Sequence, residues 1–101
     1  MKFFVIEGTF KDPMPIGKEE LQQTIAEHLI FLQKGFDEGW ILVSGPKAHA
    51  GGGIIIIKAA SMADVENYLS EDPLKISGVQ DYRIVEFKFH DCQDMLKQWF
   101  N

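Results

Sequence analysis

The chain has 101 residues, the size of one domain, and we expect a single domain over residues 1–101. Its hydrophobic fraction of 46% is too high for a disordered segment, and its formal charge of −5 opposes binding to a nucleic-acid backbone. No apolar run approaches the roughly 20 residues that span a membrane, and Cys92 is the single cysteine. We therefore expect a small cytoplasmic domain that binds neither nucleic acid nor membrane, with the role of Cys92 left open.

The first expected element is a strand over residues 2–10, because apolar residues recur on both of its faces at a period of two. Phe4 and Ile6 fall on one face, and Phe3 and Val5 fall on the other. A strand that is apolar on both sides is typical of the centre of a sheet.

A long helix is expected over residues 18–38, after a segment with two prolines and a glycine that ends the first strand. Apolar residues repeat at steps of four, four, three and four, which places them on one face of an α-helix. Gly39 is a natural left-handed stop for this helix. The apolar stripe consists of Leu21, Ile25, Leu29, Leu32 and Phe36.

Two further strands follow the helix. Residues 40–44 predict the second strand, which we expect to end at Gly45-Pro46. Residues 54–58 predict the third, because its four consecutive isoleucines favour extended structure. Small residues over 47–53, including three consecutive glycines, predict the loop between them.

A second helix is expected to begin after Ser61, a good N-cap, and to end at Asp72-Pro73, because the residue before a proline is disfavoured in a helix. The segment 74–81 is short and mixed, and we expect a loop with room for one helical turn. Residues 82–89 then predict a half-exposed or edge strand, with apolar and polar residues alternating. A short C-terminal helix capped by Asp91 is expected, with Met95, Leu96, Trp99 and Phe100 on its apolar side.

The expected order is β-α-β-β-α-β with a short C-terminal helix, which predicts an α+β, ferredoxin-like fold. Both helices of this fold cover the same face of an antiparallel sheet. The other face is left open, and the chain contains more aromatic and aliphatic residues than one helix layer can bury. We therefore expect a second copy of the chain to cover the open face.

His28 is the most informative polar residue, because it projects from the apolar stripe of the first helix. A buried imidazole needs a hydrogen-bond partner. Asp72 ends the second helix on the same side of the sheet and is the candidate. If the two meet, the carboxylate selects one tautomer of the imidazole and makes it a general base or acid. The alternatives are a core histidine bonded to a backbone carbonyl and an aspartate that only turns the chain.

Other polar clusters fit no known cofactor site. The glycines at 51–53 precede a strand, whereas a phosphate-binding turn follows a strand and opens a helix. The ligand atoms between His90 and Asp94 match no metal spacing. We expect no metal and no cofactor.

The order and spacing of several short segments resemble the YciI-like (YCII-related) family over residues 2–89. These segments are His28-Leu29-Ile30-Phe31-Leu32, Gly39, Ser44-Gly45-Pro46, the glycines before Ile54, and Asp72-Pro73 followed by Gly78. The resemblance implies a dimeric α+β barrel, in which two ferredoxin-like sheets pack face to face. It also implies a cleft in which His28 and Asp72 meet as a catalytic pair.

The resemblance further implies chemistry on small rings. A characterised relative removes chloride from a chlorinated hydroxyhydroquinone, and muconolactone isomerase shares the fold. This chain departs from the family at two places. It has Ile25 where members often carry a basic residue, and Ser77-Gly78 where they often have Ala-Gly. The first departure removes a possible anchor for an acidic substrate.

These observations together favour a cofactor-free lyase or isomerase that transfers a proton, or removes a halide, on a small cyclic or unsaturated carbonyl or phenolic compound. His28 moves the proton, and Asp72 orients the imidazole and balances its charge. A non-catalytic small-molecule-binding or regulatory dimer is the alternative, and a cofactor-independent oxygenase is a third hypothesis. The expected partners are a small-molecule ligand and a second copy, in a homodimer or a higher even oligomer. The expected substrate-binding residues are Ser44, Gly45, Pro46 and His49.

Overall fold

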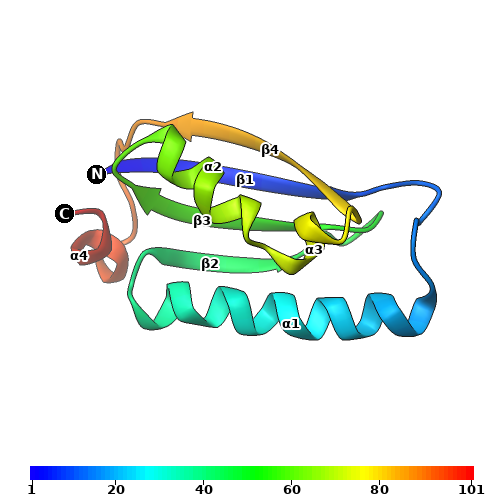
Figure 1. Cartoon of the computed structure of the whole chain (residues 1–101). Coiled ribbons are helices and arrows are strands. Elements are labelled where there is room, and N and C mark those ends of the chain that lie inside the picture. The colour runs from blue at the N-terminus through cyan, green and yellow to red at the C-terminus, as the bar shows by residue number, and fades with distance from the viewer.

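A computed structural model describes residues 1–101 and confirms the expected ferredoxin-like order (Figure 1). The four strands form one sheet in the order β2-β3-β1-β4, and every pair of neighbours is antiparallel. The central strand β1 therefore pairs on both sides, as its two apolar faces indicate. In chain order the elements are β1 (Lys2–Phe10), α1 (Lys18–Asp37), β2 (Ile41–Pro46), β3 (Gly53–Ala59), α2 (Met62–Ser70), α3 (Pro73–Ile76), β4 (Gln80–Phe87), the 3-10 turn η1 (Asp94–Leu96) and α4 (Lys97–Phe100).

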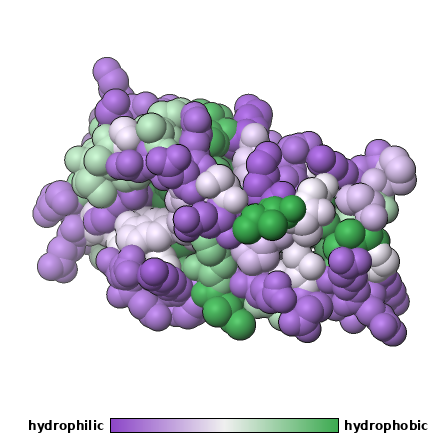
Figure 2. All heavy atoms as spheres, in the orientation of Figure 1, coloured by the Kyte–Doolittle hydropathy of each residue, from purple (hydrophilic) through white to green (hydrophobic).

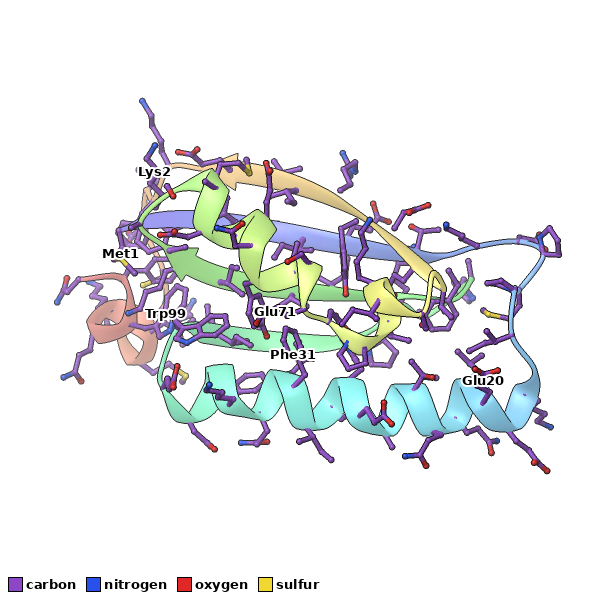
Figure 3. All side chains as sticks on the ribbon, viewed as in Figure 1. Met1, Lys2, Glu20, Phe31, Glu71 and Trp99 are labelled. Atoms are coloured by element: carbon purple, nitrogen blue, oxygen red, sulfur yellow. The ribbon has the colours of Figure 1, made fainter.

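The hydrophobic core lies between one face of the sheet and the helices α1 and α2. Phe31 of α1 stacks on Tyr68 of α2 at a ring-centroid distance of 4.5 Å, which joins the two helices above the sheet (Figure 3). The buried core residues are Phe4, Ile6, Leu32, Ile41, Ile55, Ile57, Val65 and Leu69. On the helix-bearing face, Figure 2 shows mostly hydrophilic side chains with small separate hydrophobic patches.

The end of α1 approaches β2 closely because position 35 is a glycine. A Cβ atom at Gly35 would lie 2.4 Å from Cδ1 of Ile41, so a larger residue would push the helix from the sheet. A mid-helix glycine costs about 1 kcal/mol relative to alanine, and here this close packing offsets that cost.

Strand β2 is longer than expected and contains a bulge. It ends at Gly45-Pro46 as expected, but both residues belong to the strand, because the ladder continues to the pair Pro46↔Gly53, and a proline is tolerated in an edge strand. The register moves from Ile41↔Ile57 to Val43↔Ile56, so Leu42 is an extra residue. Each residue of β2 after the bulge therefore lies on the face of the sheet opposite to the one that strict alternation would give.

Two further expectations need correction near the C-terminus. Strand β4 covers Gln80–Phe87 rather than 82–89, because Gln80 already pairs with Phe10 and the last pair is Phe3↔Phe87. Asp91 does not cap the terminal helix, since its carboxylate accepts from the adjacent backbone N–H of Cys92. The helical turn expected in the segment 74–81 is α3, which begins one residue earlier, at Pro73.

The residues after β4 return to the face of the sheet that α1 and α2 leave uncovered. There Phe3 is only 8% exposed, because it packs among the aromatic rings of Phe87, Phe89, Trp99 and Phe100. Trp99 also donates from its indole N–H to the carbonyl oxygen of Gly39 at 2.9 Å (Figure 3). We call these five rings the C-terminal aromatic cluster. No helix of the chain is both long and apolar enough to cross a bilayer.

Candidate functional site

Asp72 is a fully buried carboxylate at the point where α2 gives way to α3. Its Oδ1 accepts from the backbone N–H of Leu74 at 2.9 Å, which caps α3. Its Oδ2 accepts from the hydroxyl of Tyr82 on β4. The Asp-Pro sequence therefore does more than turn the chain: it holds a carboxylate in the interior with donors on both oxygens.

His28 of α1 supplies the third donor to this carboxylate. Its Nδ1 lies 2.8 Å from Oδ1 and 2.9 Å from Oδ2 of Asp72. An ionised carboxylate can only accept hydrogen bonds, so the imidazole carries its proton on Nδ1. In the neutral imidazole the second ring nitrogen, Nε2, then has a free lone pair. The His28 side chain is 14% exposed and lines the neighbouring cleft, so Nε2 can meet a ligand.

A cleft of about 390 Å³ lies between α1, the β2–β3 hairpin and β4, within the usual range for small-molecule sites. Ser44, Gly45 and Pro46 line it as expected. His49 is exposed and is not among the lining residues, so the geometry gives no support for its expected role. The remaining lining residues are Phe10, Ile25, His28, Leu29, Leu32, Lys47, Ala50, Gly51, Gly52, Gly53, Ile54, Ile55, Leu74, Gln80 and Tyr82.

The bulge in β2 is what brings Ser44 into the cleft. Without the extra residue, strict alternation would place Ser44 on the face opposite to Ile41. With it, Ser44 pairs with Ile55 and lies on the helix-covered side of the sheet. No periodic pattern in the sequence predicts this placement.

Two glycines allow the loop after β2 to pack on the end of β1 and close the cleft. Gly52 has a φ of +117°, and a Cβ there would lie 1.9 Å from the carbonyl oxygen of Gly8. A Cβ at Gly8 would in turn lie 2.5 Å from the Gln80 side chain. The glycine run is therefore a packing requirement of the cleft wall.

Tyr82 is the site residue that the sequence reasoning missed. It lies opposite Gly8, and it lines the cleft while donating to Asp72. Burial, followed by the hydrogen bond to Asp72, raises the pKa of Tyr82 far above its ordinary value, so it stays a neutral donor. No local signal pointed to it, because its contact with Asp72 depends on the pairing of β4 with β1.

The titratable groups outside this pair form no metal-binding cluster, since no group of three or more potential ligands is found in the chain. Lys47 lines the cleft, but its Nζ lies 3.3 Å from Oε2 of Glu7 and 3.0 Å from Oγ1 of Thr9. Cys92 is a half-buried free thiol remote in sequence from the site.

A family model described as the YCII-related domain matches residues 1–88, which is most of the chain. No curated protein matches the sequence. The match ends before the residues that form η1 and α4, so this segment lies outside the family domain.

Several solved structures share the fold. One is 5-chloro-2-hydroxyhydroquinone dehydrochlorinase from Burkholderia phenoliruptrix in complex with 2,5-dihydroxybenzoquinone, with a TM-score of 0.72 and 21% identity, covering 87% of this chain and 95% of that one. Muconolactone isomerase matches with a TM-score of 0.73 and 17% identity over 91% of this chain and 94% of that one. An antibiotic biosynthesis monooxygenase matches with a TM-score of 0.54 and 13% identity, covering 90% and 100%. At these identities the likeness establishes the fold alone.

Proposed function

Since the chain belongs to the YCII-related domain family, we propose that it is an enzyme in which His28 transfers a proton on a small cyclic or unsaturated carbonyl or phenolic compound. The reaction class is that of a lyase or an isomerase. The observation that carries this proposal is the hydrogen bonding of Nδ1 to both oxygens of a buried carboxylate, in a residue that lines the cleft. Two proteins of the same fold, a dehydrochlorinase and an isomerase, act on rings of this kind by name.

In this mechanism Nε2 of His28 takes a proton from a C–H or O–H group of the bound ring. The resulting imidazolium lies against the Asp72 carboxylate, which balances its charge. Returning the proton to a different ring atom completes an isomerisation, and loss of a leaving group completes an elimination. The Ser44 hydroxyl lines the cleft and is a candidate donor to the oxyanion that develops. General base catalysis of this type contributes about 10²–10⁴-fold to the rate.

The tautomer of His28 tests the first step. We expect ¹H–¹⁵N correlation spectra at pH 8 to show the Nδ1–H tautomer in the native protein. In Asp72→Asn the side-chain NH₂ donates to Nδ1, so the ring should change to the Nε2–H form and lose its free lone pair toward the cleft. A native His28 with its proton on Nε2 contradicts the proposal.

Turnover tests the second step. Ring ketones, phenols and halogenated hydroquinones can be incubated with the protein in D₂O, and deuterium incorporation or halide release followed by NMR. His28→Gln should reduce any observed rate about 10²-fold or more while the protein remains folded. A rate that does not change in His28→Gln would contradict the role of His28. Absence of turnover with all of these compounds would favour the alternative, a dimeric module that binds small molecules without converting them.

We also propose that the protein is a homodimer joined through the open face of the sheet. One row of four aliphatic residues crosses all the strands there, in the order Val43, Ile56, Val5 and Val85. Val43 is 48% exposed and Val85 is 41% exposed, which is unusual for aliphatic residues of a sheet. A second copy would cover this row and leave the cleft on the other side of each sheet accessible.

Light scattering tests the dimer. We expect a mass near twice 11.5 kDa at micromolar concentration, and a mass near 11.5 kDa for the double variant Val43→Lys, Val85→Lys. A matched control carries lysine at Ile76, which is 71% exposed on α3 and away from the row. A native protein that is monomeric excludes this interface.

A further inference from the structure

We propose that the cleft selects uncharged ring compounds, such as hydroquinones and quinones, and rejects analogues that carry a carboxylate. This inference rests on the proposed function, because it concerns the ligand of the same site. It goes beyond that function by naming the property by which the cleft discriminates among small rings.

The only lysine or arginine among the lining residues is Lys47, and its charge is already compensated. Its Nζ contacts Glu7 and Thr9, which follow Val5 on the face of β1 away from the helices. The hydrogen bond from Lys47, together with that from Arg83, lowers the pKa of Glu7, so this carboxylate is ionised at neutral pH. An anion in the cleft would have to compete with Glu7 for the same ammonium group.

Apart from His28, whose Nδ1 is paired with the Asp72 carboxylate, the other polar side chains that line the cleft carry no positive charge. Ser44 and Gln80 are neutral, and the raised pKa of Tyr82 keeps its hydroxyl protonated. Beneath them lies the carboxylate of Asp72, whose negative charge would repel a second carboxylate. Hydroxyl and amide groups of this kind suit the hydroxyl or carbonyl oxygens of a neutral ring.

Aliphatic residues occupy the positions where a cation could meet an acidic ligand. Ile25 precedes His28 by three residues, so both side chains lie on the same face of α1 and both line the cleft. Leu29 also lines the cleft and is 58% exposed. A carboxylate placed here would lose hydration without gaining a partner, whereas an uncharged ring would gain apolar contact.

Two probes that differ by one carboxylate test the proposal: hydroquinone and 2,5-dihydroxybenzoate. Binding is measured at pH 7 by NMR titration of the intact protein, following the His28 ring and the Ile25 methyl groups. We expect hydroquinone to shift both signals and 2,5-dihydroxybenzoate to bind at least about tenfold more weakly. A ligand seated in the cleft must perturb His28, so this readout excludes binding elsewhere.

A cation introduced into the cleft should reverse the preference. Ile25→Lys should improve binding of 2,5-dihydroxybenzoate about tenfold relative to native protein, while Ile25→Leu, a control of matched size, should not. Leu29→Lys offers a second test that is safe for folding, because this residue is largely exposed. Equal effects of lysine and leucine at position 25 would overturn the role of charge.

Two outcomes of the native titration also overturn the proposal. The first is 2,5-dihydroxybenzoate binding as tightly as hydroquinone, which would leave the proton-transfer function intact and show that Lys47 is available to anions. The second is that neither probe perturbs His28, so that the cleft does not accept uncharged monocyclic rings. The proposed function is judged separately by the tautomer of His28, so its failure and the failure of this inference are distinguishable.

Discussion

The two faces of strand β1 show two different ways of burying side chains. On the helix side, the core continues into a polar network in which three donors converge on Asp72. On the outer side, Phe3 lies in the C-terminal aromatic cluster, where contact area matters more than direction. A hydrogen bond stops contributing to stability when one of its two atoms is removed. The contribution of aromatic packing falls in proportion to the contact area that is lost. We therefore expect the two regions to respond differently to substitution.

Removing the Asp72 carboxylate is the largest expected perturbation. Asp72→Ala leaves the donors of His28, Leu74 and Tyr82 without a partner in the interior. We expect the free energy of unfolding to fall by about 3–5 kcal/mol, as for other broken buried pairs, measured by urea denaturation.

The adjacent residue provides the control for this substitution. Glu71 is exposed and its side chain makes no hydrogen bond, so Glu71→Ala should change stability by less than about 0.5 kcal/mol. If Asp72→Ala costs no more than Glu71→Ala, the network contributes little to folding and the contrast between the two faces disappears.

The outer region should respond in proportion to size. Trp99→Ala removes contacts with Phe3 and Phe100 and the hydrogen bond to Gly39, and we expect a loss of about 1–3 kcal/mol in urea denaturation. Trp99→Phe keeps most of the aromatic contact and should cost less than about 1 kcal/mol. A phenylalanine variant as unstable as the alanine variant would mean that the indole hydrogen bond, not the contact area, holds α4 in place.

Much of this contrast was predictable from the sequence, because it depends on periodicity. The alternation of Phe3 and Phe4 and the stripe that contains His28 placed these residues on the correct sides. The approach of His28 to Asp72 was expected as well, since both elements lie on one face of a ferredoxin-like sheet.

Other features depend on long-range pairing that no local pattern encodes. The bulge at Leu42 directs Ser44 into the cleft, and only the register with β3 reveals it. The hydrogen bond from Tyr82 to Asp72 depends on the pairing of β4 with β1. The return of Trp99 to Phe3 joins residues at opposite ends of the chain, so helical periodicity alone could not show what Trp99 covers.

The buried hydroxyl of Tyr82 has a hydrogen-bond partner, whereas that of Tyr68 has none. Tyr82→Phe removes a donor to Asp72 and should cost about 1 kcal/mol at pH 7. The Tyr68 hydroxyl is buried without a partner in the chain, so Tyr68→Phe should be neutral or stabilising. Equal losses in the two variants, measured by urea denaturation, would show that the hydrogen bond from Tyr82 to Asp72 adds nothing measurable to stability.

The same tyrosines predict an alkaline limit to stability. Burial raises the pKa of both hydroxyls above the ordinary value of 10.0, so the folded state retains protons that the unfolded chain releases. Their contribution is fully present below about pH 10 and is lost as the pH rises above that value. We expect urea midpoints to fall more steeply above pH 10 in the native protein than in the double variant Tyr68→Phe, Tyr82→Phe. Parallel slopes would contradict the assigned cause.

The smallest expected effect lies on the outer face, where Glu7 pairs with Lys47 and Arg83 in contact with solvent. Hydrogen bonds from these two residues hold the pKa of Glu7 below its ordinary value of 4.5. The stabilisation is therefore present above pH 4.5 and is lost as the pH falls through the lower, folded value. Glu7→Gln should slightly lower the urea midpoint at pH 7 and match the native protein near pH 2, and added salt should reduce the difference. The substitution also frees the Lys47 ammonium group from its ion pair. If that ion pair is what keeps Lys47 from binding anions in the cleft, Glu7→Gln should also bind 2,5-dihydroxybenzoate more tightly.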